Sequence, residues 1–225
     1  MRSRIQKPQN GTQSTTDAYV DLRAEMVREQ IEKRGIKDQS VLEAMRKVLR
    51  HLFVPLGFMD SAYEDNALPI DRNQTISQPY IVALMTEQLE LEPTSKVLEV
   101  GTGCGYQTAV LAEIVGRVYT IEIIPELAES ARKRLESLGY RNILMKFGNG
   151  YYGWEEHAPY DRIIVTAAPK KTPDQLIEQL AEGGRMVLPI GEYYQDLVRI
   201  CKTKHGIERE TITGVRFVPM THPPD

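Results

Sequence analysis

Three glycines at alternate positions, Gly101, Gly103 and Gly105, are the residues whose type and spacing most directly indicate chemistry. They follow a short apolar run, 97–100, that is typical of a buried parallel strand, and they precede a helical pattern over 107–115. A side chain at these glycines would occupy the space of a ligand, and the N-terminus of the following helix offers free N–H groups. The pattern predicts close approach of the backbone to a nucleotide-like ligand.

The glycine spacing also indicates which ligand. A dinucleotide site requires glycine at the first, third and sixth positions, and here the sixth is Tyr106. This favours S-adenosylmethionine over NAD. A second apolar run, 118–122, ends in Glu122, seventeen residues after Gly105. In a doubly wound sheet this carboxylate lies beside the glycine turn and can accept both ribose hydroxyl protons. The simpler alternative is a tight turn with a solvated glutamate.

Two other polar residues could carry chemistry, and each has a structural alternative. Ser77 ends a long segment without periodicity, 52–78, and loops of this length are usually functional. With Pro79 in the first turn of the next helix, however, local sequence favours Ser77 as an N-cap. Asn149 follows a strand predicted over 143–147, where it could accept from an adenine amino group or serve as a turn residue.

The composition describes an ordinary globular chain. Its 225 residues are 41% hydrophobic and 26% charged, with a net charge of −3, which argues against a nucleic-acid partner. The two cysteines, Cys104 and Cys201, lack metal-ligand or redox spacing, so we expect no metal and interpret Cys104 as a small space-filling residue. No segment has the pattern of a signal peptide or a membrane span, so we expect a cytoplasmic protein without membrane contacts.

Alternating strand and helix patterns predict a mainly parallel doubly wound sheet with helices on both faces. The expected strands cover 97–100, 118–122, 143–147, 161–166 and 185–190, followed by edge strands at 197–203 and 211–218. The expected helices between them cover 79–91, 107–115, 125–135 and 173–181, the last stopped by Gly183-Gly184. Ligands in such folds lie beyond the carboxyl ends of the strands, which places residues 101–105, Glu122, Asn149 and 166–168 around one crevice.

The N-terminal part has a different organisation. Residues 1–16 are predicted to be a disordered tail. Helical patterns follow over 19–34, stopped by Gly35, and from Ser40, where Glu43 is placed for a capping box. We therefore divide the chain into the tail, an N-terminal helical cap with a substrate loop over 17–92, and a cofactor-binding core with C-terminal strands over 93–225, all within a single compact unit.

Five segments resemble one family in its order. They are Gln-Thr-Ile-Ser-Gln-Pro at 74–79, Tyr-Thr-Ile-Glu-Ile-Ile-Pro-Glu at 119–126, Ala-Pro-Tyr-Asp-Arg-Ile-Ile-Val at 158–165, Gly-Gly-Arg-Met-Val-Leu-Pro-Ile-Gly at 183–191 and Val-Arg-Phe-Val-Pro at 215–219. From about Tyr19 to Thr221 the chain resembles the protein-L-isoaspartate (D-aspartate) O-methyltransferase family. The resemblance implies a Rossmann-like S-adenosylmethionine-dependent methyltransferase fold.

The resemblance also implies roles for individual residues. Ser77 matches the active-site serine, which reverses the local preference for a cap. Val215 and Phe217 fall in the strand whose backbone holds the substrate peptide. The cofactor would be held by Thr75, Ile76, Gly101, Thr102, Gly103, Glu122, Ile123, Gly148 and Asn149. Asn149 stands where the family usually has aspartate. Its amide oxygen can still accept from adenine, but it carries no charge. We expect a monomer.

The implied chemistry requires no general base from the protein. A carboxylate is already ionised at neutral pH, so its oxygen can attack a sulfonium methyl group without a general base. The lack of a histidine or cysteine constellation is therefore no objection, and catalysis would come from alignment and exclusion of water. The resemblance implies that methylation of L-isoaspartyl and D-aspartyl residues initiates repair of damaged proteins, because the ester loses methanol to a succinimide that partly reopens to normal aspartate.

Other functions remain open at this stage. A methyltransferase acting on a small molecule or on RNA would share the glycines and Glu122, but it would not explain segments 75–79 and 215–219. A non-catalytic binding module could retain the cofactor pocket, although the intact glycines, Glu122 and Ser77 argue against it. Tyr106 at the sixth position disfavours an NAD oxidoreductase.

Overall fold

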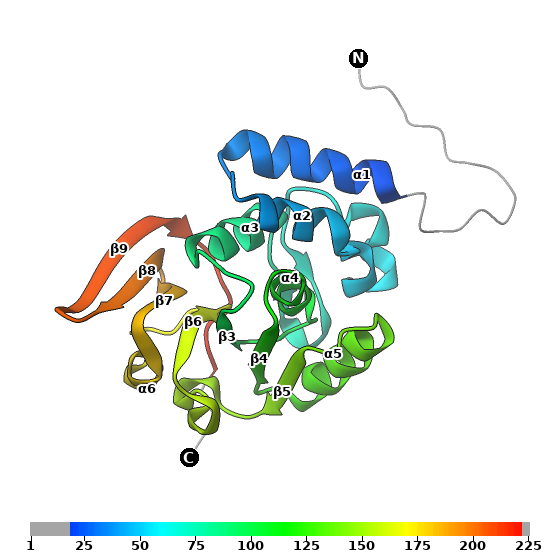
Figure 1. Ribbon diagram of the computed structural model, residues 1–225. Helices are drawn as coiled ribbons and strands as arrows, with labels where there is room; N and C mark the ends of the chain where they lie inside the picture. Colours follow the sequence, from blue (N-terminus) through cyan, green and yellow to red (C-terminus); the bar gives the residue numbers. More distant parts are fainter. Residues whose placement is uncertain (1–18, 222–225) are drawn as a thin grey trace, which may run out of the picture.

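A seven-stranded sheet forms the centre of the molecule, with the strand order β5-β4-β3-β6-β7-β8-β9 (Figure 1). The computed structural model describes residues 19–221; the tail expected over 1–16 lies outside the described residues. The strands are β3 (Lys96–Val100), β4 (Arg117–Glu122), β5 (Ile143–Phe147), β6 (Tyr160–Val165), β7 (Leu180–Gly191), β8 (Gln195–Thr203) and β9 (Gly206–Val215). A separate two-stranded ribbon pairs β1 (Leu68–Pro69) with β2 (Thr75–Ile76).

The sheet is parallel at its centre and antiparallel at one end. Strands β3 to β7 pair in parallel, whereas β8 pairs antiparallel with both β7 and β9. The central strands are nearly continuous apolar runs because both faces of a parallel sheet are covered. The predicted mainly parallel sheet with C-terminal edge strands is confirmed.

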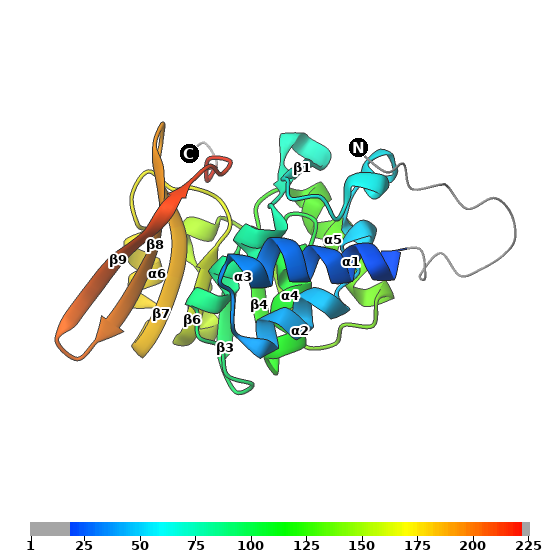
Figure 2. The same ribbon diagram turned by 90° about the horizontal axis from the view of Figure 1, so that it is seen from above.

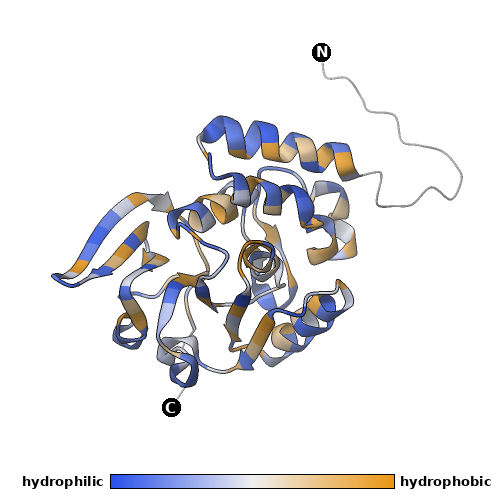
Figure 3. Cartoon of the chain, in the orientation of Figure 1, coloured by the Kyte–Doolittle hydropathy of each residue, from blue (hydrophilic) through white to orange (hydrophobic). Residues whose placement is uncertain are grey.

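Alternate strand residues point to opposite faces and build two hydrophobic clusters. Val97 belongs to a cluster that includes residues of the N-terminal helices and of the helices α3 (Pro79–Gln88), α4 (Tyr106–Ile114) and α5 (Pro125–Ser137). Leu98 belongs to the other cluster, with Leu176 of helix α6 (Asp174–Glu178). Helices thus cover both faces. Figure 3 shows α4 as mainly hydrophobic at the centre of the molecule.

The N-terminal cap lies on the outside of the first cluster. Helix α1 (Val20–Glu25) continues through a π-helical segment, Met26–Ile31, and a 3-10 turn, Glu32–Arg34, and ends at Gly35 as predicted. Figures 1 and 2 show α1 over α2 (Gln39–Lys47) and α3, farther from the sheet. The segment between the cap and α3 is irregular, as expected, and contains the 3-10 turns Arg50–Phe53, Leu56–Ser61 and Asp71–Asn73.

Two predicted helix boundaries are wrong. Helix α2 is capped by Asp38 and not by Ser40: the Asp38 carboxylate accepts hydrogen bonds from the backbone N–H groups of Ser40 and Val41. The Ser40 hydroxyl donates to the same carboxylate, because a charged acceptor is available two residues earlier. Helix α3 ends at Gln88, whereas the pattern extended it to residue 91.

The C-terminal half holds two further corrections. Helix α6 ends at Glu178, and Gly183-Gly184 lie inside β7. The pairing with β6 shifts from Tyr160↔Leu180 to Arg162↔Arg185, so the glycines belong to residues that loop out of the register. The last strand was placed at 211–218, but β9 spans Gly206–Val215 because it pairs along the full length of β8.

Among residues 19–221 no helix is long and apolar enough to cross a membrane.

Candidate active site

The glycine turn lies between β3 and α4 and has the backbone conformation that glycine permits. Gly101, Gly103 and Gly105 have φ angles of 98°, 54° and 90°. A Cβ atom built on Gly101 would lie 2.4 Å from the Thr166 hydroxyl oxygen. A side chain at this position would therefore displace Thr166 and narrow the cavity that both residues line.

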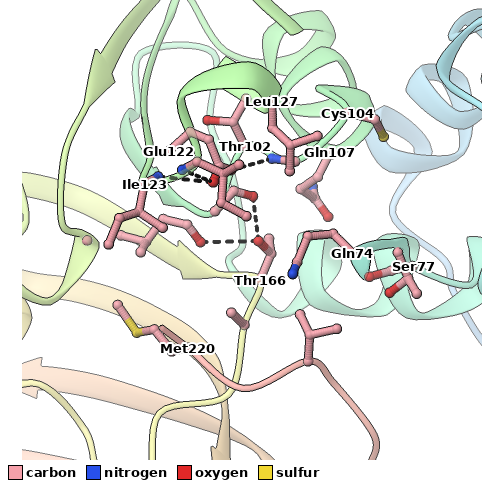
Figure 4. Close-up of a pocket in the computed structure, with 18 of the residues that line it drawn as sticks. Gln74, Ser77, Thr102, Cys104, Gln107, Glu122, Ile123, Leu127, Thr166 and Met220 are labelled. Carbon is pink, nitrogen blue, oxygen red and sulfur yellow. Dashed lines mark hydrogen bonds between the residues drawn. The ribbon is translucent and has the colours of Figure 1, made fainter. Parts of the chain in front are cut away.

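Glu122 ends β4 beside this turn, as the sequence predicted. One carboxylate oxygen accepts from the Gly103 N–H at 2.7 Å, and the other accepts from the N–H groups of Ile123 and Ile124 at 3.0 Å each (Figure 4). A carboxylate has about four acceptor positions, so one stays available to a ligand in the cavity. Glu122 therefore ties the glycine turn to the start of α5 while keeping one acceptor free.

A cavity opens between these groups at the carboxyl ends of β3, β4 and β6. Its lining includes all the predicted cofactor residues except two: Thr75, Ile76, Gly101, Thr102, Gly103, Glu122 and Ile123. The exceptions, Gly148 and Asn149, are outside the lining, although the adjacent Gly150 is part of it. Cys104 also lines the cavity, and burial raises the pKa of its thiol, which fits a space-filling role better than a reactive one.

Asn149 has both a structural bond and an unused group. Its side-chain oxygen accepts from the Tyr151 N–H at 3.0 Å, which caps the 3-10 turn Gly150–Tyr152. Its φ angle is −78°, so tolerance of a positive φ does not explain the residue. The buried amide nitrogen has no hydrogen-bond partner within residues 19–221. The group that Asn149 leaves free is therefore a donor, whereas the role predicted from the sequence is that of an acceptor.

Ser77 does not cap a helix. The N-cap of α3 is Gln78, whose side chain makes no capping hydrogen bond. Among residues 19–221 no hydrogen bond of the Ser77 hydroxyl is found, and Ser77 lines the cavity. The geometry therefore favours a hydroxyl held available for a ligand over the capping role that the local sequence favoured.

A second, wider groove of about 1110 Å³ adjoins the cavity. Its lining includes the predicted substrate residues Val215 and Phe217, together with the turn between β7 and β8. Gln195 holds this wall in place: its amide accepts from the Phe217 N–H at 2.6 Å and donates to the Phe217 carbonyl at 3.1 Å. Beyond it, the Ala168 N–H donates to the Val218 carbonyl, which anchors the segment on the other side.

The cavity and the groove share part of their lining. The shared residues are Thr75, Ser77, Thr166, Val218 and Pro219. These residues mark a junction at which a group bound in the cavity can meet a group bound in the groove. Figure 4 shows Ser77 and Thr166 among the cavity residues, contributed by different elements.

A buried carboxyl group supports the glycine turn from below. Glu99 in β3 is fully buried and accepts from the hydroxyls of Thr108 and Thr120 at 2.5 and 2.6 Å. The Thr120 hydroxyl also shares a 2.6 Å hydrogen bond with the Thr102 hydroxyl of the glycine turn, so Thr120 links the buried carboxyl group to the turn. Burial raises the pKa of Glu99 to about 8, so its carboxyl group is mainly neutral at pH 7.

The sequence gives Thr166 a place near the site but no chemical role, and it does not indicate Gln195 at all. Thr166 was placed near the crevice by topology, since it follows β6, but it carried no motif of its own. Gln195 and Phe217 are twenty-two residues apart, and the two meet only through the antiparallel register of β8 and β9. No local pattern marks Gln195, which lies two residues before the strand predicted over 197–203.

The chemistry that this arrangement supports is transfer of a group between two bound molecules. Among the described residues no cluster of histidine, cysteine, aspartate or glutamate could hold a metal ion. The glycine turn, the carboxylate at the end of the following strand and the adjoining groove, set on a mainly parallel sheet, define the class of S-adenosylmethionine-dependent methyltransferases.

The comparisons with known proteins identify the family. The family model for protein-L-isoaspartate (D-aspartate) O-methyltransferase matches residues 22–224. Protein-L-isoaspartate O-methyltransferase of Picosynechococcus sp. is 55% identical over 204 residues, covering 91% of this chain and 92% of the relative. The enzyme of Dictyoglomus turgidum is 58% identical over 191 residues, covering 84% and 87%. The chain belongs to this family.

A solved structure agrees in fold and ligand. The protein-L-isoaspartate O-methyltransferase described as putative from Plasmodium falciparum, in complex with S-adenosyl-L-homocysteine, superposes with a TM-score of 0.77 at 28% identity. The match covers 88% of this chain and 98% of that chain. The fold predicted from the sequence is confirmed, as is the enzyme class, an S-adenosylmethionine-dependent protein carboxyl methyltransferase.

Proposed function

We propose that the junction between the cavity and the groove transfers a methyl group from S-adenosylmethionine to the free carboxylate of an L-isoaspartyl or D-aspartyl residue in a damaged protein. The observation that carries this proposal is the position of Ser77. Its hydroxyl, which has no partner among the described residues, lies in the lining that the cavity and the groove share.

The residues around the cavity fit the cofactor. Glycine at position 101 leaves room for the Thr166 hydroxyl in the lining of the cavity. Glu122 keeps one acceptor position for a ribose hydroxyl, whereas the sequence pattern predicts that it accepts from two. Ile123 and Leu127 supply apolar surface. When bound, S-adenosylmethionine supplies an electrophilic methyl group, whose bond to sulfur breaks with its electron pair left on sulfur as a bond to the carboxylate oxygen forms.

Ser77 orients the acceptor. Its hydroxyl donates a hydrogen bond to the substrate carboxylate and so directs one oxygen into the junction. Because that carboxylate is already ionised at neutral pH, no side chain has to remove a proton. What remains for the protein is to hold the two reacting groups in line and to exclude water, which can supply a large part of the rate enhancement.

The wall of the groove that contains Val215 and Phe217 holds the peptide. Backbone recognition along this wall would allow many protein sequences to be accepted. The Phe217 N–H already donates to Gln195, so Phe217 contacts the substrate through its ring and the remaining lone pair of its carbonyl oxygen. Gly148 and Asn149 precede Gly150 of the cavity lining, and we place them at its adenine end, where the free Asn149 amide nitrogen can donate.

The remaining proposals concern the whole chain. Isoaspartyl-containing proteins and peptides are its partners, and a net charge of −3 speaks against nucleic acid. We propose a cytoplasmic monomer that makes no membrane contacts. Residues 17–92 supply the cap and the substrate loop, and residues 93–225 supply the cofactor-binding core.

The decisive experiment uses two peptides that differ only in carrying L-isoaspartate or L-aspartate at one position. With labelled S-adenosylmethionine we expect base-labile methyl ester on the isoaspartyl peptide alone. Binding of the cofactor without transfer to either peptide would contradict the proposal and favour a methyltransferase acting on a small molecule or on RNA.

A further inference from the structure

We propose that the Thr166 hydroxyl oxygen is a second catalytic contact at the junction, and that it accepts C–H···O interactions from the methyl group carried by the sulfonium. This inference rests on the proposed function of the cavity. It assigns to Thr166 a task opposite in polarity to that of Ser77.

The position of Thr166 follows from the sheet. Val165 ends β6 in register with Val100 of β3, and the Thr166 N–H continues the pairing by donating to the Val100 carbonyl at 2.9 Å. Thr166 therefore lies next to the glycine turn, and its hydroxyl occupies the space that a Gly101 side chain would need. Thr166 lines both the cavity and the groove.

The hydroxyl of Thr166 has no proton to offer to a ligand. Its oxygen lies 2.5 Å from the Gly101 carbonyl and 3.1 Å from the Val100 carbonyl, both of which are acceptors only (Figure 4). Its single proton must therefore point to one of them. No donor to this oxygen is found among residues 19–221, so its lone pairs remain unpaired.

The hydroxyl groups of Ser77 and Thr166 thus offer a ligand opposite hydrogen-bonding roles. The free Ser77 hydroxyl can donate, which suits an anionic carboxylate. The Thr166 oxygen can only accept, which suits a group that bears positive charge. The methyl group of a sulfonium is such a group, because the charge on sulfur polarises its C–H bonds and makes them better donors than those of an ordinary methyl group.

This assignment distinguishes the cofactor from its product. S-adenosylhomocysteine has a neutral sulfur and no methyl group, so the Thr166 oxygen has nothing to accept from it. The same oxygen would help to hold the methyl group in line with the incoming carboxylate. Removing the hydroxyl should therefore weaken binding of the methylated form alone.

The test is calorimetric binding of both compounds, without peptide, to Thr166→Ala, Thr166→Ser and the unmodified chain. We expect Thr166→Ala to bind S-adenosylmethionine about three- to tenfold more weakly, the scale of one or two weak hydrogen bonds, and S-adenosylhomocysteine with unchanged affinity. Thr166→Ser keeps the hydroxyl and should keep the ratio of the two affinities.

Other outcomes would overturn the inference. If Thr166→Ala weakened both compounds equally, the residue would only shape the glycine turn; if it weakened neither, the oxygen would make no contact. Glu122→Gln serves as the control, because a ribose contact should change both affinities together. If the unmodified chain did not bind S-adenosylmethionine, the proposed function would be rejected together with the role of Thr166. If the unmodified chain binds it and the variants behave otherwise than expected, only the role of Thr166 is rejected.

Discussion

At the scale of residues, the side chains around the junction differ in whether their hydrogen-bonding capacity is already used. Three of the roughly four acceptor positions of Glu122 already accept from backbone N–H groups. The only hydroxyl proton of Thr166 is already donated to a backbone carbonyl oxygen. The Ser77 hydroxyl makes no hydrogen bond to the residues that the structure describes. Chemical roles follow from this division more directly than from residue type.

The first prediction concerns Ser77→Ala. Because the hydroxyl supports no helix cap, its removal should leave S-adenosylmethionine affinity and stability nearly unchanged. Turnover of an isoaspartyl peptide should fall by about tenfold to a hundredfold, the scale of a lost hydrogen bond to a charged group. Steady-state kinetics and calorimetry on the same preparation check this. Equal losses in cofactor binding and in turnover would instead make Ser77 a structural residue.

The second prediction concerns the buried carboxyl group of Glu99. Burial raises its folded-state pKa from 4.5 to about 8, against the lowering effect of the Thr108 and Thr120 hydroxyls. The unfolded chain therefore releases this proton at lower pH than the folded protein, so the contribution of Glu99 becomes less favourable as pH rises from about 4.5 to 8. By pH 8 it disfavours the folded state by on the order of 3–5 kcal/mol.

Glu99→Gln should remove this dependence, because an amide oxygen still accepts from both threonines but does not titrate. The difference in unfolding free energy between variant and unmodified chain should rise in favour of the variant from pH 5 to pH 8. Urea denaturation at each pH measures it, and the effects of other carboxyl groups cancel in the difference. Parallel pH profiles for the two proteins would show that Glu99 is ionised when folded.

At the scale of elements, the wall of the groove depends on the Gln195 side chain, which makes the pair of hydrogen bonds that a neighbouring strand would make. After Val215 the chain leaves β9, and no backbone pairing with β8 continues. Gln195 replaces that pairing by binding both the N–H and the carbonyl of Phe217. The segment thereby keeps an extended course across the junction as far as Pro219, which bridges to Ala168.

We predict that Gln195→Ala loosens this wall. The KM for an isoaspartyl peptide should rise about five- to fiftyfold, since two hydrogen bonds of roughly 0.5–1.5 kcal/mol each are lost. S-adenosylmethionine affinity should change little, because Gln195 does not line the cavity. Gln175→Ala, at an exposed position of α6, is the matched control. A changed cofactor affinity with an unchanged KM would refute this role.

At the scale of the whole molecule, the two hydrophobic clusters lie on opposite faces of the sheet. The cavity opens between them, at the carboxyl ends of the central strands. The part of the chain before α3 contributes Thr75 and Ser77 to the cavity, and the part after α3 contributes Glu122 and Thr166. A cofactor in the cavity therefore contacts segments from both parts of the chain. Its binding should stabilise both together.

We predict that S-adenosylhomocysteine at a hundred times its Kd raises the unfolding free energy by about 2.7 kcal/mol. For a chain of this size that corresponds to an increase in Tm of about 5–10 °C. NAD at the same concentration should produce no shift. Thermal denaturation followed by circular dichroism measures both, and stabilisation by NAD alone would reopen the oxidoreductase interpretation.

Much of this organisation could be predicted from local patterns, because apolar runs bounded by glycine and proline determine where strands and helices begin. The glycine turn and Glu122 were found for that reason. Gly183-Gly184 was misread because the same dipeptide can stop a helix or form an irregular part of a strand, and the choice depends on pairing with β6. Helix α2 was given the wrong cap because two residues in sequence both had cap chemistry.

The site was predictable where motifs carry it and not where tertiary register creates it. Local sequence could not show that Gln78 takes the N-cap and leaves Ser77 free. Nor could it show that Gln195 meets Phe217, or that the proton of Thr166 is directed at a backbone carbonyl. The last two depend on contacts between distant segments, for which a single sequence holds no pattern.

The two antiparallel strands at the end of the sheet have a consequence for how the chain can change length. Gln195 at the start of β8 lies opposite Val215 at the end of β9, so both ends of this hairpin are fixed beside the groove. The turn that joins them, between Thr203 and Gly206, lies at the other end of the ribbon, whose outer strand is largely hydrophilic in Figure 3. Residues can be added or removed there in matched pairs without moving the junction, which makes this turn a natural point for insertion of a label or a second domain.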